Sequence, residues 1–242
     1  MVARARVNAA PDKAPDRIAG MFDAIAPRYD LLNHLLSAGI DKRWRARAIR
    51  SLQLTGREIV LDVCTGTADV ALEARRGGAS RVLGVDFAGA MLVLGRRKVA
   101  AAAENARIAL VRGDAMRLPA ADATVDAATV AFGIRNVQAP EVACAEIARV
   151  LKPGGRLAIL EFGVPRIPGL RSFYLWYFQR VLPAIGRVIS GHNAAYTYLP
   201  ASVGTFPPPD EFVTILRQAG FSQIRAVPLT FGIVYLYVAE RS

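Results

Sequence analysis

Cysteine and histidine are scarce in this chain, and their scarcity argues against several kinds of site. The 242 residues include two cysteines, Cys64 and Cys144, and two histidines, His34 and His192. The cysteines show neither C-x-x-C nor zinc-ligand spacing, so a disulfide scaffold is not expected and both thiols should be reduced, as in a cytoplasmic protein. Two histidines are too few for a histidine-based metal centre, and we expect no metal.

Long apolar runs are also missing. Hydrophobic residues make up 53% of the chain, yet no uncharged run reaches the roughly 18 residues of a membrane-spanning helix. Residues 1–17 mix alanine, proline and arginine without the apolar core of a signal peptide, so we expect a disordered basic tail. Residues 18–242 are long enough for one α/β domain, and we expect a single domain there.

Acidic residues are outnumbered by basic ones, and the formal net charge is +11. This excess favours an anionic partner, either a nucleic acid or an anionic membrane surface. Between Phe162 and Pro209 there is no acidic residue, while arginines alternate with aromatic side chains. Such a segment is typical of a helix at a lipid interface or over an apolar ligand. An inserted core helix with exposed arginines is the alternative.

Short apolar runs alternate with helical patterns through most of the chain. This alternation predicts a doubly wound, mostly parallel α/β sheet of seven strands, the architecture of Rossmann-like proteins. The expected strands are 59–63, 81–86, 108–111, 125–132, 156–162, 221–227 and 231–239, the last two pairing as an antiparallel hairpin. A tight turn is expected at 152–155. Residues 163–205 form an apolar, basic helical insertion before the last strands.

Residues 18–51 have a helical pattern that is interrupted at Ala26-Pro27, because proline restricts the residue before it. Beyond the interruption, Tyr29, Asn33 and Ser37 are four residues apart and share one helix face, with Asp30 beside them. A polar line of this kind beside an apolar one suits a lid over a ligand. An ordinary solvated helix face is the alternative.

A small polar loop follows the first expected strand. Asp62 and Asp69 flank Thr65-Gly66-Thr67, and Asp86 ends the second strand, 20 residues beyond Gly66. Open α/β sheets bind ligands beyond the carboxyl ends of their strands, where an acidic residue can accept hydrogen bonds from both ribose hydroxyls. The pattern therefore predicts an adenosine compound as ligand.

The loop has one glycine where a dinucleotide fingerprint, G-x-G-x-x-G, requires three to approach a pyrophosphate. A nicotinamide oxidoreductase is therefore disfavoured. Carboxylates around the loop favour a cationic ligand such as S-adenosylmethionine, whose amino group and sulfonium are positive. After the third strand, a carboxylate and a backbone N–H are available to adenine. The predicted cofactor residues are Asp62, Thr65, Gly66, Thr67, Asp86, Asp114 and Ala115.

The fourth strand continues into Arg135 and Asn136, where a methyl acceptor would meet the donor. An enzyme that methylates amino groups of nucleic acids would commonly carry Asn-Pro-Pro-aromatic here to hold a flipped base, and that motif is absent. Arg135 and Asn136 instead offer donors to oxygen atoms and can stabilise a developing negative charge. The alternative is that Arg135 caps the strand end or pairs with a carboxylate.

Four stretches resemble sequence blocks of one enzyme family. They are residues 22–37 with Trp44, residues 131–137, residues 149–155 with Glu161, and residues 196–202. On these blocks the chain is similar to the demethylmenaquinone and ubiquinone-pathway C-methyltransferases, over residues 18–240. Two positions depart from the family pattern: Asp41 stands where a histidine is usual, and Ala131 where a serine is frequent.

The resemblance implies S-adenosylmethionine-dependent methylation of a ring carbon of a prenylated quinol. Demethylmenaquinol is the expected substrate, and a methoxy-benzoquinol of the ubiquinone pathway is the alternative. The family places methyl-donor contacts on Thr67, Asp86, Asp114 and Ala115. We expect Arg135, Asn136, Tyr29 and Asp30 to be catalytic, and Asn33, Tyr196 and Tyr198 to bind the quinol.

The expected partners follow from that substrate. A prenylated quinol resides in a membrane, so the enzyme is expected in the cytoplasm or peripherally on the inner, anionic face of the membrane. A homodimer stays open, and no nucleic acid is expected. An RNA methyltransferase is the rival interpretation, because the charge of +11 would suit RNA.

Overall fold

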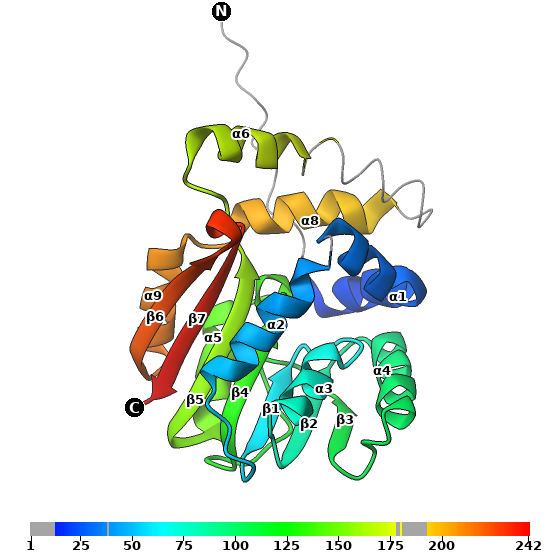
Figure 1. Ribbon diagram of the computed structural model, residues 1–242, viewed down its shortest axis with the longest axis vertical. Helices are drawn as coiled ribbons and strands as arrows, with labels where there is room; N and C mark the ends of the chain where they lie inside the picture. Colours follow the sequence, from blue (N-terminus) through cyan, green and yellow to red (C-terminus); the bar gives the residue numbers. More distant parts are fainter. Residues whose placement is uncertain (1–12, 38, 178–179, 181–192) are drawn as a thin grey trace, which may run out of the picture.

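The computed structural model describes residues 13–37, 39–177, 180 and 193–242 (Figure 1). Its centre is a seven-stranded sheet in the order β3-β2-β1-β4-β5-β7-β6, in which β7 runs antiparallel to both neighbours. The strands are β1 (Ile59–Val63), β2 (Arg81–Asp86), β3 (Ile108–Arg112), β4 (Val125–Ala131), β5 (Leu151–Phe162), β6 (Phe221–Leu229) and β7 (Val234–Arg241). The doubly wound α/β prediction is confirmed, together with its antiparallel closing hairpin.

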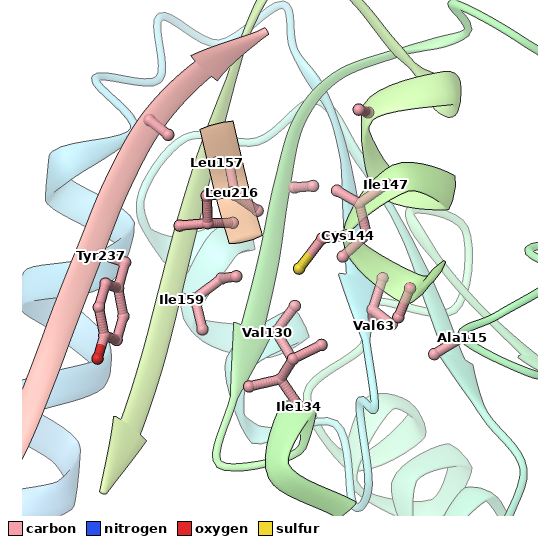
Figure 2. Close-up of a cluster of buried hydrophobic side chains, with 14 of the residues drawn as sticks. Val63, Ala115, Val130, Ile134, Cys144, Ile147, Leu157, Ile159, Leu216 and Tyr237 are labelled. Carbon is pink, nitrogen blue, oxygen red and sulfur yellow. The ribbon is translucent and has the colours of Figure 1, made fainter. Parts of the chain in front are cut away.

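Helices cover both faces of the sheet. On one face lie α5 (Pro140–Val150) and α9 (Pro209–Gln218), and on the other lie α2 (Ile40–Ser51), α3 (Asp69–Arg76) and α4 (Gly89–Ala101). In β1, Leu61 and Val63 belong to the first core and Val60 to the second, which explains why this strand is apolar on both sides. Figure 2 shows Val63 in the first core, together with Ile147 of α5.

The expected turn at 152–155 lies inside β5 as an irregularity of the sheet. Leu151 pairs with Val125 and Arg156 pairs with Ala127, so four residues of β5 stand opposite one residue of β4. A Cβ on Gly155 would come within 2.7 Å of the carbonyl oxygen of Lys152. Glycine is therefore required for the chain to fold back into register here.

The predicted interruption at Ala26-Pro27 is wrong, because α1 runs unbroken from Pro15 to Leu36. Ile25 and Ala26 are buried in a third core with Met91 of α4. We attribute the continuity of the helix to this packing, which offsets the hydrogen bond that proline removes. The helix also begins within the stretch expected to be a tail, of which residues 1–12 lie outside the described residues.

Two further helices lie across the carboxyl ends of the strands (Figure 1). They are α6 (Pro168–Trp176) and α8 (Asn193–Thr205), both from the expected insertion. Tyr174 of α6 and Val203 of α8 join α1 and α4 in the third core. The end of the sheet where the site was predicted is therefore covered by α1, α6 and α8. In the described part of the chain, no helix combines the length and apolarity needed to cross a membrane.

Candidate active site

The loop after β1 is built on left-handed backbone. Cys64, Gly66 and Ala68 have φ angles of 56°, 54° and 66°, and Thr65 N–H donates to the carbonyl of Val85 in β2 at 3.0 Å. No heavy atom lies within 4 Å of the position that a Cβ on Gly66 would take. The space beside this glycine is therefore open to a ligand, as its place at the carboxyl edge of the sheet predicts.

Asp62 of β1 holds the loop after β1 in place through hydrogen bonds of its buried side chain. Its carboxylate is 1% exposed and accepts hydrogen bonds from the Thr65 hydroxyl at 2.5 Å and from the Thr129 hydroxyl of β4 at 2.7 Å. Burial raises the pKa of Asp62 to about 6, although the two hydroxyls act in the opposite direction. Both carboxylate oxygens are therefore engaged with the protein, and Asp62 orients the loop. Its contact with a cofactor stays a prediction.

Asp86 joins the end of β2 to the same loop. One of its carboxylate oxygens accepts from Gly66 N–H and the other from Ala88 N–H, both at 2.8 Å. Burial raises the pKa of Asp86. Each carboxylate oxygen keeps a further acceptor site, so the group can still accept from ribose hydroxyls.

The third strand end lies beside Asp86, because Gly113 N–H donates to the Asp86 carbonyl at 3.0 Å. Asp114 is exposed and accepts from Met116 N–H at 2.9 Å, while Ala115 is buried. The structure thus brings the predicted residues of β1, β2 and β3 to neighbouring strand ends. An open glycine after β1, a carboxylate at the end of β2 and an exposed carboxylate after β3 fit the shape and polarity of S-adenosylmethionine.

Thr67 differs from the other predicted cofactor residues. Its hydroxyl donates to Asp30 of α1 at 2.6 Å and accepts from Lys98 of α4 at 2.9 Å. Lys98 also forms a salt bridge with Asp30 at 2.6 Å. The Thr67 side chain is therefore held by α1 and α4, and its contact with the cofactor stays a prediction.

Arg135 and Asn136 lie in a short 3-10 helix, η1 (Ile134–Asn136), directly after β4. Arg135 Nη1 donates to Glu161 Oε1 of β5 at 2.8 Å, and the Arg135 guanidinium stands 5.2 Å from the Phe162 ring centroid. Pairing of Arg135 with a carboxylate, the alternative given above, is therefore present. It does not use every donor of the guanidinium.

Three polar atoms remain without a hydrogen-bond partner in this part of the described structure. They are Nε of Arg135, Oδ1 of Asn136 and the hydroxyl of Tyr198 in α8, and all three are buried. Burial raises the pKa of Tyr198, and the nearby Arg135 guanidinium acts in the opposite direction. Buried polar atoms in native proteins almost always have a partner, either protein, ordered water or ligand, so these three atoms are candidates for contact with a polar ligand.

Three predicted residues have side chains outside the described part, namely Tyr29, Asn33 and Tyr196.

Two residues that contact the predicted site were missed by the sequence analysis or given no role there. Lys98 is 31 positions from Thr67 and belongs to no motif. Glu161 stands near the end of the apolar strand β5. A carboxylate at such a position can be buried or exposed, and the sequence does not show that its partner is Arg135. Among the described residues, no group of three His, Cys, Asp or Glu side chains could hold a metal ion.

These features define a class of protein before any comparison is made. A seven-stranded sheet in this order, with helices on both faces, is the fold of the class I S-adenosylmethionine-dependent methyltransferases. Solved structures agree on the fold. The [4+2]-cyclase SpnF superimposes with a TM-score of 0.72 at 18% identity, covering 98% of this chain and 99% of its own. A putative methyltransferase from Bacillus halodurans gives 0.57 at 18% identity, with 81% and 94% covered.

Sequence comparison then gives the family. The model of the ubiE/COQ5 methyltransferase family matches residues 11–241. The ubiquinone/menaquinone biosynthesis C-methyltransferase UbiE of Syntrophotalea carbinolica is 50% identical over 223 residues, covering 92% of this chain and 93% of its own. The demethylmenaquinone methyltransferase of Thermus thermophilus is 46% identical over 222 residues, covering 91% and 100%. The chain belongs to the ubiE/COQ5 family and is an S-adenosylmethionine-dependent C-methyltransferase.

Proposed function

We propose that this enzyme methylates a ring carbon of a prenylated quinol, with demethylmenaquinol as substrate and menaquinol as product. The observation that carries the proposal is the group of buried, unpartnered polar atoms on Arg135, Asn136 and Tyr198. The names of the relatives support a quinone pathway. A methoxy-benzoquinol of the ubiquinone pathway is the second candidate substrate, because the relatives named UbiE refer to both quinones.

The chemistry asks two things of the protein. S-adenosylmethionine supplies an electrophilic methyl group when it is bound. A quinol carbon becomes nucleophilic as the neighbouring hydroxyl loses its proton, and it would form a bond to the methyl group as the bond from methyl to sulfur breaks. The ring regains aromaticity when that carbon loses its hydrogen as a proton, and the oxygen takes up a proton again to give the methylated quinol. The protein must therefore stabilise a phenolate oxygen and hold the ring in line, and alignment alone can contribute on the order of 7–11 kcal/mol.

Arg135 suits the first requirement. Its Nε is a charged donor in a buried setting, where hydrogen bonds to a developing anion are strong. Asn136 Oδ1 can accept from a second hydroxyl of the ring, and Tyr198 can donate or accept. Glu161 holds the other side of the guanidinium, so Arg135 is oriented before the acceptor arrives.

The lid residues take different parts in this proposal. Tyr29 and Asn33 lie four residues apart on α1, and we assign them to contacts with the ring. Asp30 pairs with Lys98 and Thr67, and these contacts support a role in holding α1 rather than a contact with the acceptor.

The test is transfer of a labelled methyl group from S-adenosylmethionine to reduced demethylmenaquinone. A methoxy-benzoquinol and total RNA should be assayed in parallel under the same conditions. We expect rapid transfer to demethylmenaquinol and none above background to RNA. Faster transfer to the methoxy-benzoquinol would move the enzyme to the ubiquinone pathway, and transfer to RNA alone would overturn the proposal.

We further propose that the enzyme works on an anionic membrane surface through α6. Phe173 and Trp176 of this helix are 59% and 54% exposed, and their rings lie 5.8 Å apart. Arg171 and Arg180 are exposed on the same segment. Tyr174, in contrast, is buried in the core over the strand ends. A helix with one face in the protein and exposed aromatic and arginine side chains suits a lipid interface, where tryptophan is enriched.

Liposome flotation tests this partner. Replacing Phe173 and Trp176 with serine should reduce binding to vesicles that contain an anionic phospholipid, with little change in the transfer rate to a short-chain quinol in solution. Val142 of α5 is 43% exposed and belongs to another helix, and Val142→Ser is the matched control. Unchanged flotation of the double variant would contradict membrane docking through α6.

A further inference from the structure

One ammonium group connects the lid helix to the cofactor loop. Lys98 Nζ lies 2.6 Å from Asp30 Oδ2 of α1, 2.6 Å from Asp69 Oδ1 at the start of α3, and 2.9 Å from the Thr67 hydroxyl. A lysine has three N–H donors, and here each has an acceptor. Because Thr67 in turn donates to Asp30, Lys98, Thr67 and Asp30 form a closed ring of contacts.

The contacts continue from Asp69 into the second helix. Arg45 of α2 pairs with Asp69 and with Asp41, and Asp41 accepts from the Ser37 hydroxyl at 2.8 Å. The Asp41 carboxylate is thus part of the same network. Four helices, α1 to α4, are therefore joined by charged side chains around the loop after β1, residues 64–68.

A second contact holds the same two helices together. Asp23 of α1 accepts from Ala90 N–H in the first turn of α4 at 2.8 Å, and Ile25 packs with Met91 in the third core. Figure 1 shows α1 lying over the end of α4 beside the carboxyl ends of β1 and β2. Asp23 and Asp30 of α1, 7 residues apart in the sequence, thus both contact α4, through Ala90 N–H and through Lys98.

We infer that Lys98 is a positioning residue for the cofactor site: it joins Asp30 of α1 to Thr67 in the loop after β1 and to Asp69 at the start of α3, and so holds α1 over that loop. If the Lys98 ammonium were removed, the carboxylates of Asp30 and Asp69 would lose the cation that lies between them. Asp69 would keep Arg45, whereas Asp30 would keep only the neutral Thr67 hydroxyl of the contacts described here. Repulsion would then favour a lid that is displaced from the loop.

This role predicts that a change at Lys98 alters the affinity for S-adenosylmethionine more than the rate of methyl transfer. Among the described contacts, Lys98 makes none with the unpartnered polar atoms of Arg135, Asn136 and Tyr198. Its loss should therefore weaken the affinity for S-adenosylmethionine, because binding must then also bring the lid into place. The turnover rate at saturation of both substrates should change little. The inference rests on the cofactor site rather than on the identity of the quinol.

The experiment compares Lys98→Met with Arg97→Met, which removes an exposed charge from the adjacent position of the same helix. Calorimetry without any acceptor should give an S-adenosylmethionine dissociation constant about tenfold higher for Lys98→Met and unchanged for Arg97→Met. Hydrogen exchange of residues 18–26 should be faster in Lys98→Met, and the cofactor should restore its protection. Unchanged affinity and unchanged exchange in Lys98→Met would overturn the inference.

Two further variants separate positioning from simple loss of stability. Lys98→Arg keeps the charge and should retain most of the affinity. Asp30→Asn should accelerate exchange in residues 18–26 by itself, and adding it to Lys98→Met should produce less than the sum of the two single effects. Additive effects would mean that the two residues act separately. Because these binding measurements need no quinol, a failed quinol assay would leave their outcome intact.

Discussion

Nη1 of Arg135 lies 2.8 Å from Oε1 of Glu161, a carboxylate with no exposed surface. The same carboxylate accepts from the backbone N–H groups of Arg135 at 3.2 Å and Phe162 at 2.7 Å. The guanidinium is thereby fixed from one side while its Nε remains without a partner. An ion pair built in this way orients a charged donor toward the acceptor before the substrate binds.

Neutralising Glu161 should be costly for the fold. In Glu161→Gln the Arg135 charge stays buried without its counter-charge, and breaking a buried pair in this way costs about 3–5 kcal/mol. Urea unfolding measures the loss. Asp122→Asn is the matched control, because the Asp122 side chain is 77% exposed where it pairs with Arg149, and such surface pairs contribute at most about 1 kcal/mol. Equal losses in the two variants would contradict the special role of the buried pair.

The donor itself is tested by Arg135→Lys. This change keeps a positive charge beside Glu161 but removes Nε, so the fold should survive while the acceptor loses a hydrogen bond. Removing one donor to a developing anion costs roughly 10²–10³ in rate. We expect single-turnover methyl transfer to fall by that factor, with the S-adenosylmethionine dissociation constant unchanged. A rate within twofold of the original enzyme would remove Arg135 from the chemistry.

Asp62 should make stability depend on pH in an unusual direction. Its pKa in the folded protein is about 6, against an ordinary value of 3.8, because burial disfavours the charged form. A raised pKa means that the folded state binds more protons than the unfolded state between these two values. Asp62 therefore favours folding most below pH 3.8, and this contribution is lost as pH rises through 6. The shift corresponds to about 3 kcal/mol.

Asp62→Asn should remove this dependence. Urea unfolding from pH 4 to pH 7 should show the original protein losing stability relative to Asp62→Asn as the pH rises. Asp114→Asn, which removes an exposed carboxylate at another strand end, serves as the control. Parallel pH profiles for the original protein and Asp62→Asn would contradict the raised pKa of Asp62.

The sequence patterns predicted the sheet, its closing hairpin and the strand-end carboxylates, because strand periodicity and loop composition are local properties. They could not predict Lys98, since its partners Asp30 and Thr67 meet it only through the packing of α1 on α4. The interruption at Pro27 was wrong for a related reason: tertiary packing of Ile25 overrode a local preference. What the sequence predicts poorly here are the contacts between elements.

The close approach of the first and fourth strand ends depends on Gly133. A Cβ at this position would lie 2.3 Å from Cys64 Cβ and 2.9 Å from Cys64 Sγ, and a Cβ cannot move away as the end of a flexible side chain can. Gly133→Ala should therefore push the loop after β1 away from η1, destabilising the protein by about 1–3 kcal/mol.

The same displacement should move the loop after β1 away from Arg135. S-adenosylmethionine binding and methyl transfer should therefore both be lost, even under conditions where the variant is still folded. Gly204→Ala is the control, because no heavy atom lies within 4 Å of its Cβ position in α8, and alanine there should stabilise the helix by about 0.5–1 kcal/mol. Calorimetry and thermal unfolding measure both effects. Normal cofactor binding by Gly133→Ala would show that the two strand ends can separate without harm to the site.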